Sequence, residues 1–495
     1  MKIVALNPPF LSHFSRESRS PAVAKSGTLY YPMWLAYAVG LLEKHGHEVM
    51  LIDAPAENIS RDTVIERIRK FNPAMAFVAT STPSIYNDVE VGAALKDTCL
   101  ELFTVFVGVH VSALPCESLE LSSKIDAVAF GEFDMTLVEL AEKLTTGRPS
   151  DELLGSIAGL AYRTNDGRCV KNATRPFIED LDIFPPVASV YKKHLSTAPY
   201  FYGHSLHPII VIMTGRGCPF RCTYCVVPQV LQGHQYRQRS INSIVEEFRY
   251  IRDNFPEVKE IMIEDDTLTA NKKRCAELSK ALINQGLTTI PWSANSRADV
   301  DLETMRLMKA AGCRLFCVGF ESGNQQILDN IQKGTKIPVI ERFVKDAKRA
   351  GIMIHGCFMV GNRGETRQIL EETLRFAKKL NPDTAQFYPI MVYPGTADYV
   401  YYQEKGWIVS ENFREWITEE GLHSSTMSNP DLPYDELVRF CDRARREFYL
   451  RPSYILFKAI QSFKKPAEAR RNIKAFFALS RYLFRTAMPR KKGQC

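Results

Sequence analysis

Short apolar runs alternate with amphipathic stretches over the first 150 residues, a pattern typical of strands that alternate with helices. The apolar runs predict strands at residues 2–8, 48–53, 75–80, 103–108 and 126–130. Helical spacing predicts helices at 34–44, 61–71 and 87–99 and another after Gly131-Glu132, with Ser60 as the N-cap of the second. This order is typical of an α/β, doubly wound sheet, so residues 1–150 are predicted to form a Rossmann-like domain.

A second series of strand and helix units begins near residue 206. Strands are predicted at 209–214, 260–264, 290–295, 315–320, 353–360 and 385–392, and helices at 244–254, 272–284, 302–311, 337–350 and 368–380. Six such units predict a parallel barrel or partial barrel over residues 206–405. Residues 151–205 are expected to be a linking segment with a hairpin that turns at Asn165-Asp166-Gly167, and residues 406–495 a helical, basic region.

Composition is that of a globular protein, with 45% hydrophobic and 24% charged residues among 495. No apolar run reaches the length of a membrane span, and the N-terminus is interpreted as a first strand rather than a signal peptide. Most of the 12 cysteines are scattered, which favours a reducing, cytoplasmic environment and argues against a disulfide framework.

The positive charge of the chain is concentrated at its C-terminal end. After residue 450 there are twelve Lys and Arg residues against Glu468 alone, a net +11, which leaves −4 for the first 450 residues of a chain whose net charge is +7. A slightly acidic body argues against nucleic acid as a partner.

Three cysteines, Cys218, Cys222 and Cys225, are spaced CxxxCxxC in the segment TGRGCPFRCTYCVVP, after the first strand of the second series. A cubane iron–sulfur cluster takes four thiolates, so three leave one iron open to a ligand that is not protein. The alternatives are three unrelated core cysteines or a zinc knuckle, for which His234 is the available fourth ligand but lacks knuckle spacing. Cys313 and Cys317, also spaced CxxxC, are interpreted as buried apolar cysteines rather than ligands of a second cluster.

Polar or glycine residues follow every strand of the second series, where a barrel places its chemistry. One such loop is ordinary turn chemistry, but six in succession after a three-cysteine loop indicate an active site. The candidate residues are Tyr224 beside the last cysteine, Glu264-Asp265-Asp266, Ser293 and Arg297, Glu321, the run Gly361 to Glu365, and the segment Tyr393 to Thr396.

The runs CPFRCTYC, RQRSINSIVEEF, IEDDTLTAN, SANSRAD, GFESGNQQILDNIQKG and YPGT resemble the radical S-adenosylmethionine (SAM) enzymes that carry an N-terminal cobalamin-binding domain. The resemblance implies a partial (β/α)6 barrel in which Cys218, Cys222 and Cys225 hold a [4Fe–4S] cluster. The open iron would chelate SAM, and an electron from the cluster would cleave it to a 5′-deoxyadenosyl radical. It also implies that Glu264, Asp265 and Asp266 lie near the SAM amino group, and that Ser293, Arg297 and Glu321 contact its ribose or carboxylate. The loop GNRGET departs from the commoner GLPGET.

The first domain resembles the cobalamin-binding domain of the same enzymes through NPPF, a Ser/Thr-rich loop, GVHVSALP and GEFDMTLVELA. The resemblance implies cobalamin at the strand ends, beside Ser81, Thr82, Gly108, His110, Gly131 and Glu132. No DxHxxG is present, and Gly108-Val109 stands where the family has two glycines, so cobalamin is expected base-off without a protein ligand. His110 is interpreted as a loop histidine rather than a cobalt ligand. A Rossmann-like domain without cofactor is the alternative.

The C-terminal segment RREFYLRPSYILFKAI resembles the subgroup that contains the anaerobic magnesium-protoporphyrin monomethyl ester cyclase and hopanoid-modifying enzymes. Beyond it, Ile473, Phe476 and Phe477 are interleaved with Arg470, Arg471 and Lys474. Such a helix either lies on an anionic membrane as a peripheral contact or packs its apolar stripe on the barrel.

These resemblances predict a methyltransferase that acts at an unactivated carbon of a small molecule, lipid or tetrapyrrole, with an external donor such as flavodoxin or ferredoxin reducing the cluster. A cyclase or oxidative rearrangement with the same cofactors is the alternative. A redox-sensing or cluster-carrier protein would lack the six strand-end loops. An RNA-modifying methylthiotransferase would need a basic barrel surface and further N-terminal cluster cysteines, and neither is seen.

Overall fold

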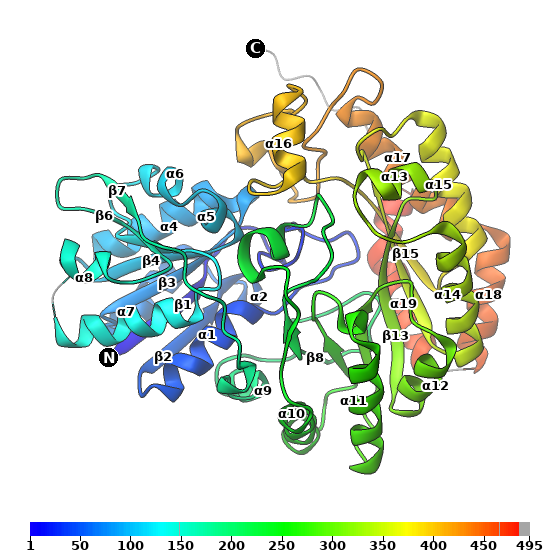
Figure 1. The fold of residues 1–495 in the computed structure, drawn as a ribbon, viewed down its shortest axis with the longest axis horizontal. Coiled ribbons are helices and arrows are strands. Elements are labelled where there is room, and N and C mark those ends of the chain that lie inside the picture. Colours follow the sequence, from blue (N-terminus) through cyan, green and yellow to red (C-terminus); the bar gives the residue numbers. More distant parts are fainter. Residues whose placement is uncertain (148, 465, 485–495) are drawn as a thin grey trace.

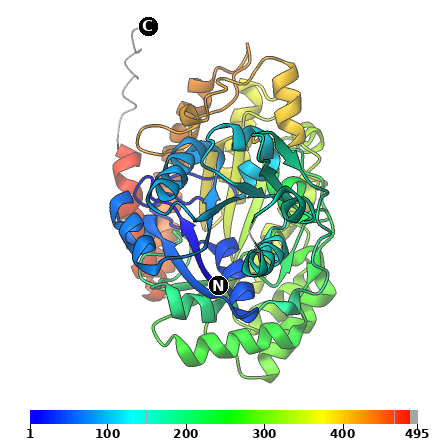
Figure 2. The same ribbon diagram turned by 90° about the vertical axis from the view of Figure 1, so that its left-hand side faces the viewer.

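A computed structural model describes residues 1–147, 149–464 and 466–484 of the chain. Figure 1 shows a first α/β domain, blue to cyan, beside a larger barrel that runs from green to yellow. The C-terminal helices, orange to red, lie against the barrel. Figure 2 views the molecule from the side of the first domain, which lies in front of the barrel.

The first sheet has the order β2-β1-β3-β4-β5-β6-β7, and its first five strands are parallel. The chain crosses from β2 on one side of β1 to β3 on the other, so the sheet has a switch point between β1 and β3, where ligands bind in such folds. The parallel strands are β1 (Lys2–Asn7), β2 (Glu48–Asp53), β3 (Met75–Thr80), β4 (Phe103–Gly108) and β5 (Ala127–Ala129).

Helices cover both faces of this sheet because its strands are almost wholly apolar. They are α1 (Met33–Lys44), α3 (Arg61–Phe71), α4 (Ile85–Thr98) and α7 (Asp134–Thr146), with the shorter α2 (Ala54–Glu57), α5 (Val109–Ala113), α6 (Pro115–Glu120) and α8 (Asp151–Gly155). Ser60 caps α3 by accepting a hydrogen bond from the Thr63 amide, as the sequence predicted.

The expected hairpin in the linking segment is present and extends the first sheet. Its strands β6 (Leu160–Arg163) and β7 (Cys169–Lys171) are antiparallel, and β6 pairs with β5. One cysteine pair differs from the expectation of free thiols: Cys116 in α6 and Cys169 in β7 form a disulfide. The other described cysteines are free. The sequence did not predict this disulfide, because the two cysteines are 53 positions apart and only the packing of α6 on β7 brings them together.

Six parallel strands form the partial barrel, in the order β8-β11-β12-β13-β14-β15. The strands are β8 (Ile209–Ile212), β11 (Glu260–Ile263), β12 (Trp292–Ser296), β13 (Cys313–Glu321), β14 (Met353–Val360) and β15 (Thr384–Pro389). The helices between them are α10 (Ile241–Asn254), α11 (Lys272–Asn284), α12 (Leu302–Ala310), α13 (Gln325–Asn330), α14 (Ile337–Ala350) and α15 (Arg367–Leu380). The α/β fold predicted from the sequence is confirmed.

The region after the barrel is helical in its second half. Helix α16 (Ala397–Glu404) precedes an irregular stretch with the short turn η5 (Phe413–Trp416), and α17 (Tyr434–Tyr449) then packs on β15. Helices α18 (Pro452–Lys464) and α19 (Pro466–Phe484) pack on each other. Among the described residues, none of the helices has the length and apolarity that crossing a membrane requires. The basic residues from Arg485 onward lie outside the described part of the chain.

Candidate active site

The cysteine loop projects from the carboxyl end of β8, between the short strands β9 (Gly215–Arg216) and β10 (Arg237–Gln238). Gly217 begins the loop at φ +84°, and a Cβ there would lie 2.3 Å from the Gln235 carbonyl oxygen, so only glycine fits. Gln229, in the following helical segment η3 (Val227–Gln232), donates from Nε2 to the carbonyls of Cys222, Thr223 and Cys225. These bonds hold the backbone of the last two cysteines in place.

The three thiols suit a cluster better than a single zinc ion. All three are half-buried and line one cavity. Among the described residues, Cys218, Cys222 and Cys225 are not a group whose donor atoms lie within 4.8 Å of one another, as ligands of one ion would be. His234 directs Nδ1 to the carbonyls of Cys218 and Phe220, so it supports the loop backbone instead of completing a knuckle.

Electrostatics favour the protonated thiol at Cys218 and Cys225. Burial raises the pKa of Cys218 to about 11, and the Asp266 carboxylate adds to the effect. Burial also raises the pKa of Cys225, again with Asp266 as the next cause. Thiolate ligation therefore requires the cations of a cluster to displace the protons.

The three acidic residues after β11, Glu264-Asp265-Asp266, have two different roles. Asp265 is fully buried and accepts hydrogen bonds from the Thr214 and Gly215 amides, the Thr214 hydroxyl and the Tyr236 hydroxyl. It therefore fastens the base of the cysteine loop and does not line the cavity. Glu264 and Asp266 do line the cavity.

Glu264 and Asp266 are prepared to receive a cation. Arg19 of the first domain contacts both, at 2.9 Å and 3.4 Å, but Asp266 Oδ2 and the Thr267 hydroxyl are buried with no hydrogen-bond partner in the part of the chain that the structure describes. Burial raises the pKa of both carboxyl groups, and Arg19 partly offsets it. An ammonium group such as that of SAM would satisfy the unpaired oxygens, so these residues fit SAM.

The next strand ends place Arg297 and Glu321 in the cavity but not Ser293. Ser293 is fully buried and donates to the Met262 sulfur. Arg297 donates to the Lys333 and Gly334 carbonyls, and its guanidinium lies 3.5 Å from the centroid of the Phe220 ring. Its Nε atom is buried with no hydrogen-bond partner among the described residues and lies 3.9 Å from Asp299 Oδ2.

Glu321 is the centre of a small polar network at the end of β13. It accepts from the Tyr224 hydroxyl at 2.9 Å and from Lys333 Nζ at 2.7 Å, and Lys333 also donates to Tyr224. Burial lowers the pKa of Lys333, but Glu321 outweighs this and leaves it raised, so the lysine stays charged. Glu321 has φ +62°, a conformation that non-glycine residues adopt where the surroundings impose it.

The predicted cobalamin residues gather at the carboxyl edge of the first sheet. Ser81 and Thr82 follow β3, Gly108 ends β4, and His110 directs Nδ1 to the Thr82 hydroxyl at 3.2 Å. Hydroxyls beside a glycine backbone suit the amide groups of a corrin, so these residue types fit cobalamin. Burial lowers the pKa of His110 to about 3, so its imidazole is neutral.

An aromatic turn covers the same edge. The Phe413 ring packs edge-on against His110 with centroids 4.9 Å apart, and η5 packs on the turn η1 (Thr82–Ser84). A corrin at these strand ends would contact this turn. Sequence reasoning did not anticipate it, because Phe413 lies some 300 residues after His110.

Gly131 and Glu132 have separate surroundings. Gly131 has φ +71° and open space at its Cβ position, and its amide donates to Ser112. Glu132 is buried in ion pairs with Arg216 and Arg237 of the barrel, so it joins the two domains. Burial raises the pKa of Glu132, but Arg216 and Arg237 together hold it below its usual range.

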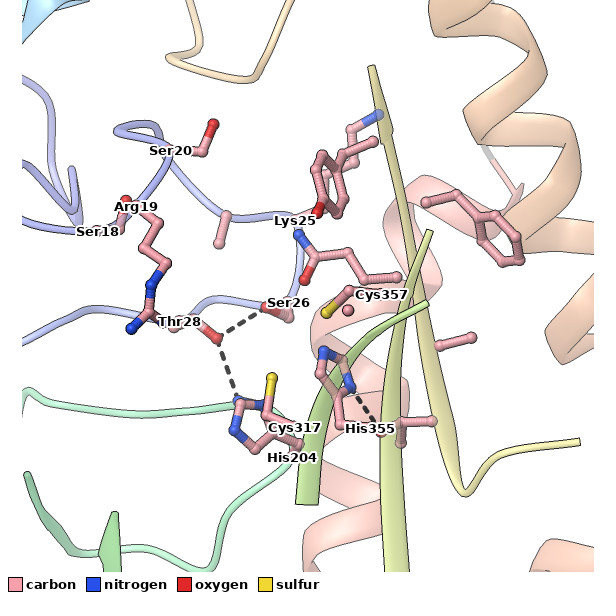
Figure 3. A pocket seen from close by; sticks show the side chains of 18 of the residues that line it. Ser18, Arg19, Ser20, Lys25, Ser26, Thr28, His204, Cys317, His355 and Cys357 are labelled. Atoms are coloured by element: carbon pink, nitrogen blue, oxygen red, sulfur yellow. Dashed lines mark hydrogen bonds between the residues drawn. The ribbon is translucent and has the colours of Figure 1, made fainter. Parts of the chain in front are cut away.

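One cavity of about 1190 Å³ connects the cysteine loop to the C-terminal helices. The segment after β1 forms one wall, and Figure 3 labels Arg19, Lys25 and Thr28 of this segment among the side chains that line the cavity. Cys317, expected to be buried, instead lines the cavity half-exposed together with Cys357 and His355, whereas Cys313 is buried as expected. Neither the wall nor Cys357 carried a local signal in the sequence.

Two family matches cover most of the first domain and the barrel. Residues 212–377 match the radical SAM superfamily, and residues 19–141 match the B12 binding domain. The two spans contain the cysteine loop, the three acidic residues after β11 and the strand-end residues of the first sheet.

Curated relatives extend the similarity over most of the chain. An uncharacterized methyltransferase of Pyrococcus horikoshii is 32% identical over 92% of this chain and 94% of its own length. The anaerobic magnesium-protoporphyrin IX monomethyl ester cyclase of Rubrivivax gelatinosus is 29% identical over 72% of this chain and 63% of its own. The hopanoid C-3 methylase of Methylococcus capsulatus is 22% identical over 82% of this chain and 75% of its own length.

Solved structures share the fold. The radical SAM methyltransferase TsrM of Kitasatospora setae superposes with a TM-score of 0.69 over 90% of each chain, at 18% identity. The cobalamin-dependent radical SAM enzyme OxsB gives 0.62 over 89% of this chain and 61% of its own, at 16% identity. The two-domain arrangement is therefore that of known structures.

Proposed function

The chain belongs to the radical SAM superfamily, in the branch with an N-terminal B12 binding domain, and on that premise we propose that it methylates an unactivated carbon of an apolar small molecule. Its cofactors are a [4Fe–4S] cluster, SAM and cobalamin. When bound, the cluster and SAM supply a 5′-deoxyadenosyl radical and methylcobalamin supplies the methyl group. Cys218, Cys222 and Cys225 would hold the cluster, and Glu264 and Asp266 would orient the SAM ammonium group.

The size and lining of the cavity are the main support for the proposed substrate class. Its volume of about 1190 Å³ exceeds the roughly 300–1,000 Å³ typical of a site for one small molecule, so it has room for SAM and a second compound. One end holds the three cysteines, and the other reaches Ile455, Phe476 and Phe477 of α18 and α19. We infer that an apolar compound enters beside these helices and reaches the cysteine loop through the cavity.

Helices α18 and α19 present large apolar side chains to solvent where the cavity opens. Phe463 is 92% exposed, Phe477 69% and Leu456 63%, and the two helices together carry seven of the fourteen exposed large apolar side chains of the described residues. Arg470 and Lys474 are exposed on the same surface. An exposed apolar group flanked by basic residues is typical of helices that lie on an anionic membrane, so we propose a peripheral membrane contact here.

Two further parts of the proposal concern partners. Cluster reduction needs a one-electron donor, and we propose a protein of the flavodoxin or ferredoxin class. The cyclase of Rubrivivax gelatinosus is similar to the chain at 29% identity, so a radical cyclisation with the same cofactors is the second candidate function.

Product analysis tests the reaction. The chain, reconstituted anaerobically with iron, sulfide and hydroxocobalamin and reduced with dithionite, would receive SAM labelled with a deuterated methyl group and a membrane lipid extract. We expect deoxyadenosine, S-adenosylhomocysteine and label in the lipid fraction. Cys222→Ala should abolish deoxyadenosine, whereas Cys99→Ala, a free cysteine outside the cavity, should not. Deoxyadenosine without S-adenosylhomocysteine would contradict methyl transfer and favour the cyclase.

Vesicle sedimentation tests the membrane contact. The chain should co-sediment with phosphatidylglycerol vesicles but not with phosphatidylcholine vesicles, since both apolar and charge contributions are needed. Phe477→Asp should abolish binding, and Leu100→Asp, which changes a residue 76% exposed on the first domain, should not. Equal binding by the Phe477→Asp variant would refute the contact.

A further inference from the structure

Two neighbouring barrel strands bring two thiols and an imidazole together inside the cavity. Cys317 lies on β13 directly opposite His355 of β14, and Cys357 follows His355 two residues later, on the same face of β14. One donor atom from each of the three residues lies within 4.8 Å of the other two. Figure 3 shows the three side chains projecting into the cavity.

The residue set and spacing match a single thiophilic ion. Tetrahedral zinc with sulfur at about 2.3 Å and nitrogen at about 2.0–2.1 Å separates its donors by roughly 3.5–3.8 Å, so a contraction of at most about 1.3 Å completes the site. Two cysteines and a histidine with one open position are a ligand set that zinc uses in catalytic sites. These three residues are separate from the cysteine loop, which suits a cluster.

The surroundings orient the imidazole as a ligand. The Thr384 hydroxyl bonds Nδ1 of His355 at 2.8 Å, so the other ring nitrogen, Nε2, is the one that would bind the ion, in exchange for the hydrogen bond that the Gln386 side chain makes with this imidazole. The His204 ring stacks on His355 with centroids 4.6 Å apart, and its own Nε2 is buried without a hydrogen-bond partner among the described residues. Such second contacts hold a metal-binding histidine in one orientation.

We propose that Cys317, His355 and Cys357 bind one Zn²⁺ ion with its fourth position open to the cavity. All three side chains are half-exposed to that cavity, so the fourth ligand is water or a donor atom of the molecule bound there. None of the three residues is among those assigned above to the cluster, SAM or cobalamin, and the proposal does not depend on the methyl-transfer reaction.

Metal analysis of the anaerobically purified, cluster-reconstituted chain tests the site. We expect one zinc per chain, and zinc-edge X-ray absorption should show two sulfur and one nitrogen ligand, with oxygen or nitrogen as the fourth. Cys357→Ser and His355→Ala should lose zinc and keep the electron paramagnetic resonance signal of the reduced cluster. Cys313 lies on β13 like Cys317 but is buried outside the cavity, so the Cys313→Ala variant should keep both the zinc and the cluster signal.

A chain with Cys218, Cys222 and Cys225 all changed to Ala separates this site from adventitious zinc in the cysteine loop. It should lose the cluster and keep the zinc. Zinc that disappears with the loop cysteines, or a wild-type spectrum with three or four sulfurs, would overturn the proposal. A Cys317–Cys357 disulfide found by mass spectrometry in place of zinc would overturn it too. The wild-type spectrum decides the question even if a variant does not fold.

Discussion

Arg19 of the first domain donates a hydrogen bond to Glu264 of the barrel, with Nη1 2.9 Å from Oε1. The other terminal nitrogen donates to the Asp265 carbonyl at 3.0 Å and contacts Asp266. The residues are 245 positions apart, and their contact closes the segment after β1 over the cavity. One guanidinium thus joins the domains and compensates two buried carboxylates.

Replacing Arg19 by Met should weaken this closure. Hydrogen bonds to charged groups contribute about 1.5–3 kcal/mol to stability. Because the Arg19 side chain is 36% exposed, solvent screens part of this contribution, and we expect the free energy of unfolding to fall by about 1–2 kcal/mol. A lower thermal unfolding midpoint and a weaker SAM affinity, measured by calorimetry, check it. Arg168→Met, in the exposed turn of the hairpin, is the matched control. An unchanged midpoint and affinity would show that Arg19 does not close the cavity.

The strands and helices could be predicted because their signals are local. The apolar run at residues 75–80 matches β3 at both ends, and the helix predicted at 61–71 begins after its Ser60 cap and ends at Phe71. The carboxyl ends of the barrel strands also indicated where Glu264, Asp266 and Glu321 would meet, because parallel strands end at one edge.

The remaining features depend on contacts that no local pattern encodes. Cys317 and Cys357 are adjacent only because β13 and β14 pair in one register, and CxxxC spacing drew attention to Cys313 instead. Asp265 differs from its neighbours because strand alternation turns it toward Thr214, away from the cavity. Arg19 and Phe413 come from irregular segments, whose positions depend on the packing of the whole molecule.

A buried ion network between the domains should be essential for stability. Arg216 contacts Glu132 at 2.9 Å and Asp134 at 2.7 Å, and all three side chains are at most 5% exposed. Arg216→Met would leave Asp134 charged and unpaired, a change that costs about 3–5 kcal/mol for a buried pair. We expect the thermal midpoint to fall by several degrees, far more than for Arg168→Met. Equal midpoints for the two variants would contradict this role.

The turn at Phe413 should compete with cobalamin for the edge of the first sheet. Phe413 packs on His110 and Trp416, with centroids 4.9 Å and 5.1 Å apart, where a corrin is expected. Phe413→Ala removes these contacts, so a competing closed state becomes less populated and the apparent affinity for cobalamin rises. If the lost packing is worth about 1 kcal/mol, the apparent affinity for cobalamin should rise roughly fivefold.

Titration with hydroxocobalamin, followed by its visible spectrum, measures this affinity. Phe463→Ala is the control, because Phe463 is an exposed aromatic residue on α18, remote from the first sheet. Weaker binding by Phe413→Ala than by the control would instead identify the turn as a wall of the cobalamin site.

Glu365 should make stability depend on pH. It is 3% exposed after β14, where it accepts hydrogen bonds from the Gly361 and Asn362 amides. Burial raises its pKa to about 7, and these amide bonds only partly offset the shift. Because the pKa is higher in the folded chain than in the unfolded chain, the stabilisation is complete below about pH 4.5 and is lost as the pH rises through about 7.

Glu365→Gln keeps an acceptor for both amides and removes the ionisation. The free energy of unfolding of the variant, relative to that of the wild type, should therefore rise by about 2–3 kcal/mol when the pH is raised from about 5 to about 8. This follows from a shift of roughly two units in the Glu365 pKa. Thermal midpoints measured at both pH values check the difference. Glu17 and Asp53, whose pKa values burial also raises, titrate in both proteins and cancel in the comparison. Parallel pH profiles for the two proteins would show that Glu365 stays ionised across this range.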